Sequence, residues 1–312
     1  MLDGRLGLDV PKGWWPNPPM LKAMEAAGFG WVQARTPPRS VLRDPERLLR
    51  HARELRRVLE TGGLKLVLHA PDDLSAGDPD DDRTLDGLLD YAAATGARFV
   101  VYHGLNFPAA SGADEHFVAR LRDRAAREEA SLHARVPRLE RLGVTLAIEN
   151  LAPVHPGPPR LCYDPTLVRG LALRLGSPRV GMLFDAGHAN IVAGQRGTDL
   201  RPLLEPVLPT VVLFHLHDNL GARGDRGSVP GLDPLRLDLH LAPGAGRLGW
   251  GGVAGLMLSR PVPLVLEVHP PHRPEPLRLA QVTAGLLLRD RPAVGGARPA
   301  VERGGSVSVP VG

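Results

Sequence analysis

The sequence is poor in cysteine and in long apolar runs, and each shortage excludes a class of protein. Cys162 is the only cysteine in 312 residues, so no intrachain disulfide framework can form and a reducing compartment is expected. No stretch of about 20 consecutive apolar residues occurs, and the first residues lack the charged and then apolar pattern of a secretory signal. We therefore predict a cytoplasmic protein with no membrane partner.

Lysine is also scarce, because Lys12, Lys22 and Lys65 are the only three in the chain. Arginine therefore carries nearly all of the positive charge behind the formal net charge of +4 and the isoelectric point of about 9.7. Such an excess of positive charge suggests that the protein binds nucleic acid. The arginines, however, are spread along predicted helices such as 43–57 among acidic residues, which favours an ordinary solvated surface.

Eight short apolar runs alternate with helical patterns along the chain. With 43% hydrophobic and 23% charged residues, the composition is that of a globular protein able to bury a large core. The predicted strands are 5–10, 31–35, 64–69, 99–103, 145–149, 180–185, 211–218 and 263–268. Helices are predicted over 19–28, from Asp44-Pro45 to Gly62, over 84–95 and 115–142, from Asp164-Pro165, and within 188–207, 251–259 and 275–290.

This alternation predicts an α/β fold, a single (β/α)₈ TIM barrel over residues 1–290. A doubly wound open sheet is the alternative, but no Gly-rich dinucleotide-binding turn follows the first predicted strand. The acidic segment 72–82 is predicted to be a loop without an assignable role. Residues 291–312 are rich in Gly, Pro, Val and Ser without a period, which predicts a disordered tail.

The run 211–218 shows how the strands present their polar residues. Because side chains alternate along a strand, His215 and His217 share a face with Leu213. A hydrophobic strand that ends in imidazoles predicts chemistry at the carboxyl-terminal rim of a barrel, where the active sites of this fold lie.

Other predicted strands end in the same way. His69, His103, Glu149, Asp185, His215 and Glu267 end six successive strands, His188 follows the sixth, and Asp238 and His240 lie in the loop after the seventh. Burying so many acids and imidazoles together is costly unless cations pair with them, so a divalent-metal site is predicted. Mixed imidazole and carboxylate ligands suit Zn²⁺, Mn²⁺, Fe²⁺ or Co²⁺ rather than Ca²⁺.

The number of ions stays open between one and three. Glu149, Asp185, His215 and Glu267 would suffice for one ion. The other five residues could hold a second or third ion, or they could bind substrate hydroxyls.

Five residues are considered for contacts with the substrate. His188 could contact the substrate as well as a metal ion. His217 and Asp218 have no ligand position in the ring, so they either support the ligands from behind or face the substrate. Arg35 is a candidate clamp for a phosphate or hydroxyl group, with a surface arginine as the alternative. Trp15 could stack on a sugar face or pack within its own loop.

The order and spacing of these motifs resemble the xylose-isomerase-like TIM-barrel superfamily over roughly residues 5–290. The motifs are Leu-His-Ala-Pro71, Tyr-His-Gly104, Ile-Glu-Asn150, Phe-Asp-Ala-Gly-His188, Phe-His-Leu-His-Asp-Asn219, Asp-Leu-His240 with Gly-Ala-Gly246, and Leu-Glu267. That superfamily contains sugar and sugar-phosphate isomerases and epimerases, and nucleases of the endonuclease IV type (AP endonuclease family 2).

The resemblance implies two sets of roles. In the isomerase and epimerase branch, residues matching Glu149, Asp185, His215 and Glu267 hold one divalent ion such as Zn²⁺ or Mn²⁺. The two matching glutamates move a proton through an enediolate, and a histidine matching His188 contacts the substrate. In the nuclease branch all nine positions hold three zinc ions, which cleave a phosphodiester of abasic DNA.

Several segments depart from the nuclease pattern. Residues 10–16 are not His- or Ser-rich, Asn219-Leu220 stand where the nucleases carry a lysine, and Ala245 replaces a glutamate. We therefore expect a sugar or sugar-phosphate isomerase or epimerase with a small-molecule substrate. A trinuclear zinc phosphodiesterase is the alternative, and nucleic acid is the less favoured partner.

Overall fold

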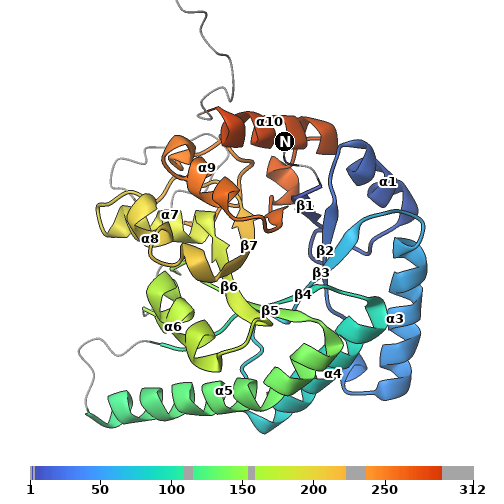
Figure 1. Ribbon diagram of the computed structural model, residues 1–312, viewed down its shortest axis with the longest axis vertical. Coiled ribbons are helices and arrows are strands. Elements are labelled where there is room, and N and C mark those ends of the chain that lie inside the picture. The colour runs from blue at the N-terminus through green and yellow to red at the C-terminus, as the bar shows by residue number, and fades with distance from the viewer. Residues whose placement is uncertain (1, 3, 109–114, 154–158, 223–236, 290–312) are drawn as a thin grey trace, which may run out of the picture.

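The computed structural model contains a closed barrel of eight parallel strands in the order β1 to β8 (Figure 1). It describes residues 2, 4–108, 115–153, 159–222 and 237–289. The strands are β1 (Leu6–Asp9), β2 (Trp31–Arg35), β3 (Lys65–His69), β4 (Phe99–Tyr102), β5 (Thr145–Glu149), β6 (Val180–Asp185), β7 (Val211–Leu216) and β8 (Leu264–Leu266). The predicted TIM barrel is thereby confirmed, whereas the predicted tail 291–312 lies outside the described residues.

Helices surround this barrel (Figure 1). They are α1 (Pro18–Ala26), α2 (Arg39–Leu42), α3 (Pro45–Leu59), α4 (Pro79–Thr95), α5 (Glu115–Leu142), α6 (Pro165–Leu175), α7 (Ala186–Gln195), α8 (Arg201–Leu204), α9 (Trp250–Ser259) and α10 (Pro276–Leu288). Short 3₁₀ helices lie at η1 (Leu161–Tyr163), η2 (Leu208–Thr210) and η3 (Pro270–His272). In the described part of the chain, no helix combines the length and the apolar character needed to cross a bilayer.

Aspartate followed by proline begins three of the helices. Asp44 accepts hydrogen bonds from the backbone of Glu46 and Arg47 at the start of α3, and Asp164 caps α6 in the same manner. The prediction for α4 was wrong at its beginning, because the helix starts at Pro79 rather than at residue 84. Asp78 is its N-cap, so half of the acidic segment belongs to the first turns of a helix.

An apolar layer fills the inside of the barrel and fixes the position of the polar rim. It consists of Trp31, Val67, Val101, Ala147, Leu183, Leu213 and Val265, which pack on one another. Gly7 leaves room for it, because a Cβ there would lie 2.9 Å from Trp31 Cβ and from Val265 Cγ2. The residue two positions after each member of the layer must point inward as well, one step closer to the carboxyl-terminal rim.

Those seven residues are Gln33, His69, His103, Glu149, Asp185, His215 and Glu267. The strand alternation therefore places six of the nine predicted ligands in one ring. β7 ends at Leu216, so His217 and Asp218 follow the strand instead of belonging to it as predicted. β8 likewise ends at Leu266, one residue before Glu267.

Candidate metal centre

The centre of the rim holds four buried side chains from four successive strand ends. Glu149, Asp185, His215 and Glu267 each offer a ligand atom, and these atoms all lie within 4.8 Å of one another. We call these four residues the central cluster. His215 Nδ1 lies 3.0 Å from Glu149 Oε1, 3.6 Å from Glu267 Oε2 and 3.7 Å from Asp185 Oδ2.

Gln33 holds the central cluster from the side of β2. Its Oε1 lies 2.8 Å from His215 Nε2, so that nitrogen donates a proton, and the neutral ring would offer Nδ1 to a metal ion. The amide nitrogen of Gln33 donates to Glu267 Oε1, and it lies 3.4 Å from Asp9 Oδ1. The sequence analysis named neither Gln33 nor Asp9 as a site residue.

Two oxygen atoms of the central cluster are buried without a hydrogen-bond partner. They are Glu149 Oε2 and Asp185 Oδ2. The other oxygen of Asp185 accepts from the backbone nitrogen of His188 at 2.7 Å and so caps α7. Buried carboxylate oxygens without donors are costly. A divalent cation would satisfy both atoms, so this donor set fits a metal ion.

Two further groups flank the central cluster. The first consists of His69, Asp72 and His103, and the second of His188, His217, Asp238 and His240; within each, one ligand atom per residue lies within 4.8 Å of the others. His69 Nε2 and His103 Nε2 lie 3.6 Å and 3.2 Å from Glu149 Oε2. Glu149 therefore faces both the central cluster and the first group.

Four of the flanking histidines have Nδ1 near a backbone carbonyl. For His69 it is the carbonyl of Ala70, at 2.8 Å. The Nδ1 atoms of His103, His188 and His240 lie 3.0, 2.9 and 2.7 Å from the carbonyl oxygens of Asp72, Asn150 and Glu267. In a neutral imidazole the Nδ1–H would donate to that carbonyl and leave Nε2 to bind a cation. Histidines that bind metals have this second hydrogen bond.

In the metal-free site, buried carboxylates and imidazoles lie close together and shift one another's pKa values. Although burial opposes its ionisation, His215, His103 and His69 hold the pKa of Glu149 well below its usual range. Burial also disfavours a charged His215, but Glu267 and Glu149 raise its pKa to about 9. Protons on the imidazoles thus balance the carboxylates, in the place that metal ions would take.

A cavity of about 430 Å³ opens above the cluster. Its polar lining consists of Arg35, His69, Asp72, His103, Glu149, His188, Asp238, His240 and Glu267. Arg35 Nη1 lies 2.5 Å from Asp72 Oδ1 and 2.7 Å from His69 Nδ1. This volume suits a small molecule.

The sequence of residues 21–287 matches the family model described as xylose isomerase-like TIM barrel. The chain belongs to this family. No protein of curated function matches its sequence significantly.

Solved structures of the family share the barrel. A D-tagatose 3-epimerase-like protein is 16% identical, with a TM-score of 0.67 over 91% of this chain and 97% of that one. A xylose isomerase domain protein from Alicyclobacillus acidocaldarius is 19% identical, with a TM-score of 0.61 over 91% and 98%. D-psicose 3-epimerase from Clostridium cellulolyticum H10 is 15% identical, with a TM-score of 0.60 over 91% and 94%. These similarities show the fold of the family.

In the structure, all nine predicted metal ligands lie together at the rim. That they bind metal stays a prediction. Arg35 lines the cavity, as expected for a clamp. Trp15 does not line it, because its ring packs edge-on against His51 with centroids 4.6 Å apart. This position agrees with the alternative interpretation, in which Trp15 packs within its own loop.

His217 and Asp218 are both fully buried and absent from the cavity wall. Asp218 accepts hydrogen bonds from the backbone of Asn219, Gly244 and Leu248, and from the indole of Trp250. Neither residue can therefore touch a molecule in the cavity, as substrate-facing residues would. Asp72, which had no assigned role, lies at the cavity wall beside Arg35.

Proposed function

We propose that this chain is a divalent-metal-dependent isomerase or epimerase of sugars or sugar phosphates. The observation that carries the proposal is the position of Glu149 and Glu267. Both carboxylates belong to the central cluster and both line the cavity of about 430 Å³. Two carboxylates at one small-molecule cavity are suited to moving a proton between the carbon atoms of a bound sugar.

The central cluster would hold the metal ion through Glu149, Asp185, His215 and Glu267. When bound, a Zn²⁺ or Mn²⁺ ion would supply Lewis-acid polarisation of the substrate carbonyl. His215 offers Nδ1 because Gln33 engages its other nitrogen. Asp185 is oriented by Asn150, whose Oδ1 accepts from the Asp185 backbone nitrogen at 2.9 Å.

Glu149 and Glu267 would move the proton. Neighbouring cations lower the pKa of both carboxylates, so both are ionised at neutral pH and can accept a proton from the carbon beside the carbonyl. Protonation of the opposite face by the second carboxylate would give an epimer. Burial and Glu267 raise the pKa of the nearby Asp9 to about 7, so Asp9 can donate a proton near neutral pH. The side-chain amide of Gln33 lies between Asp9 and Glu267.

Arg35 would position the substrate. Its guanidinium lies at the cavity wall, and its Nε atom is buried without a hydrogen-bond partner. The charge of this guanidinium would attract a hydroxyl or phosphate oxygen of a molecule in the cavity. Lys12 pairs with the same Asp72 at 2.9 Å and adds a second positive group near the mouth.

Proton exchange with solvent tests this function. The metal-loaded protein is incubated in D₂O with ketopentoses, ketohexoses and their phosphates, and NMR follows deuterium at the carbon beside the carbonyl. We expect exchange and a new stereoisomer with at least one sugar, and a loss of about 100-fold or more in Glu149→Gln and Glu267→Gln. The exposed Glu46→Gln is the matched control. No exchange with any of these sugars would refute the proposal.

Phosphoester hydrolysis is the second candidate function, and the two flanking groups favour it. Together with the central cluster, they give the rim enough possible ligands to hold more than one metal ion. Against it, Asn219 stands where the nucleases carry a lysine, and its amide is used internally by Asn190 and Gly187. Hydrolysis of an abasic-site duplex by protein carrying three zinc ions, without sugar exchange, would replace the first proposal with this one.

A further inference from the structure

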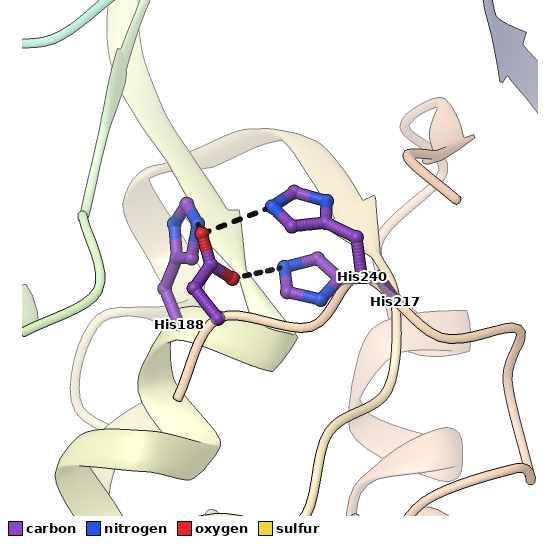
Figure 2. Close-up of side chains that lie close together, drawn as sticks. His188, His217 and His240 are labelled. Atoms are coloured by element: carbon purple, nitrogen blue, oxygen red, sulfur yellow. Dashed lines mark hydrogen bonds and ion pairs between the residues drawn. The ribbon is translucent and has the colours of Figure 1, made fainter. Parts of the chain in front are cut away.

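Three imidazole rings are stacked at one side of the rim. The ring of His240 lies on that of His217, with centroids 3.8 Å apart and planes inclined by 9°, and Figure 2 shows these two rings one above the other. The ring of His269 is also stacked on His240, with centroids 4.5 Å apart and an angle of 22°. One face of an imidazole has room for a single stacked ring, so His217 and His269 cover opposite faces of His240.

The backbone around His240 explains why these rings meet. Asp218 and Leu241 exchange two backbone hydrogen bonds of 2.8 Å, which join this segment to the residues that follow β7. The backbone nitrogen of His269 donates to the carbonyl of His240 at 3.0 Å, which joins the segment to the residues that follow β8. Residues 240–241 therefore lie between the continuations of two barrel strands, and each of the three neighbouring segments supplies one histidine.

Polar contacts hold the edges of the His240 ring, while the stack holds its faces. Its Nδ1 lies 2.7 Å from the carbonyl oxygen of Glu267, and its Nε2 lies 3.1 Å from Asp238 Oδ2. With both faces covered and both nitrogens engaged, the ring has a single orientation. The φ of His240 is 47°, in the left-handed region that a non-glycine residue keeps only where the surrounding structure fixes it.

His269 differs from the other two members of the stack. It lies outside the central cluster and outside both flanking groups of possible ligands. It is half-buried and lines a side chamber of about 280 Å³. Arg35, Asp72, His240 and Glu267 line both this chamber and the main cavity, so the two spaces adjoin. Without the ring of His269, one face of His240 would be open to the chamber.

We propose that His269 is a positioning residue, which holds the ring of His240 in the orientation that directs its Nε2 toward Asp238 and a cation bound there. His269 acts through the flat face of its ring and not through its nitrogens. A ligand that is already oriented binds a metal ion more tightly, because binding does not have to restrict its ring. The inference rests on the metal-binding part of the proposed function, extended to the predicted ligand His240, and on no particular substrate.

Two substitutions separate the face of His269 from its nitrogens. His269→Phe keeps a flat ring, whereas His269→Leu keeps apolar volume without one. In zinc titrations of the chelator-treated full chain, we expect wild-type affinity in His269→Phe and a loss of about tenfold in His269→Leu. Proton NMR of the metal-free chain follows the stack itself, because the Hε1 signal of His240, assigned by its absence in His240→Gln, should move when the ring current is lost in His269→Leu. His133→Leu, at an exposed position of α5, should match the wild type in both measurements.

Two results would overturn the inference. One is a His269→Leu protein with the zinc affinity and the His240 signal of the wild type. The other is a His269→Phe protein that binds zinc as weakly as His269→Leu, because the nitrogens of His269 would then be what matters. Failure of the proposed function is seen separately, in the wild-type exchange assay. A wild type without sugar exchange, whose zinc affinity still falls in His269→Leu and not in His269→Phe, would leave this role of His269 standing.

Discussion

At the scale of single residues, the centre depends on a neutral side chain among charged ones. The amide of Gln33 accepts from His215 and donates to Glu267, so one group orients two of the four members of the central cluster. A charged residue here would favour one partner and repel the other. Gln33 would therefore be a positioning residue for the proposed metal ion.

Gln33→Met keeps the size of the side chain and removes both hydrogen bonds. The N–H of His215 would be left buried without an acceptor, at a cost of about 1–3 kcal/mol in the free energy of unfolding. We expect the affinity for Mn²⁺ to fall by about 10–100-fold, as measured by calorimetric titration. Gln281→Met, on the exposed side of α10, should leave both quantities unchanged. Wild-type affinity in Gln33→Met would contradict the positioning role.

Why the sequence analysis missed Gln33 is a matter of residue type. Histidines and acids at strand ends stand out because they bind metals, and their place at those ends predicted that six of them lie on the rim. Gln33 follows Trp31 with the same period, but an amide carries no such chemical signal. Its role follows only from the closure of the barrel, which brings β2 opposite His215.

At the scale of elements, Asp218 organises the segment that follows β7. Its Oδ1 accepts from the backbone of Asn219 at 2.9 Å and of Leu248 at 3.0 Å. Its Oδ2 accepts from Gly244 and from the indole of Trp250, each at 2.9 Å. The carboxylate thus joins the end of β7 to the start of α9.

Asp218→Asn replaces one of these oxygens with an N–H group that meets two donors. We expect the free energy of unfolding to fall by about 1–3 kcal/mol, as seen by urea denaturation. Trp250→Phe, which removes only one of the four hydrogen bonds, should have the smaller effect. An Asp218→Asn protein as stable as the wild type would show that these hydrogen bonds contribute little.

Gly187, in the first turn of α7, sets the space available to His217. A Cβ at this position would lie 2.1 Å from the imidazole of His217, so Gly187→Ala must displace the ring or the helix. We expect a loss of about 1–3 kcal/mol in unfolding free energy. Gly252→Ala in α9 meets no atom within 4 Å and should be neutral or stabilising by up to about 1 kcal/mol. Thermal unfolding of the two variants and the wild type compares the pair.

The elements differ in how far they could be predicted. The eight strands were found because each is an apolar run before a polar end, and α3 and α6 because Asp-Pro marks their first turns. Asp78-Pro79 carries the same signal for α4, but the surrounding acids obscured it. The burial of His217 and Asp218 could not be predicted, since it depends on the segment 237–250 that folds over them.

At the scale of the whole molecule, the protonation of the imidazoles and carboxylates at the rim depends on pH. In the metal-free chain the carboxylates around His215 and His240 raise the pKa of each imidazole from 6.5 to about 9. A raised pKa means that the folded state binds the proton more tightly than the unfolded state. This stabilisation is complete below pH 6.5 and is lost as the pH rises through 9.

Metal binding should reverse this dependence, because the same imidazoles must be neutral to act as ligands. We expect the Tm of the metal-free protein to fall between pH 6.5 and 9, while the gap to the zinc-saturated protein widens. At 100 times the dissociation constant, a bound ion adds about 2.7 kcal/mol of stability. Differential scanning calorimetry with chelator and with zinc measures both curves.

His215→Gln separates the two contributions within that experiment. It removes one proton-binding group and one proposed metal ligand together. Its metal-free Tm should therefore fall less steeply with pH, and its gap to the zinc-loaded form should shrink. The exposed His133→Ala should reproduce both wild-type curves. A gap that stays constant from pH 6.5 to 9 would mean that protons and metal do not compete for the rim. The orphaned oxygens of Glu149 and Asp185 would then need a different cation, such as the guanidinium of a ligand.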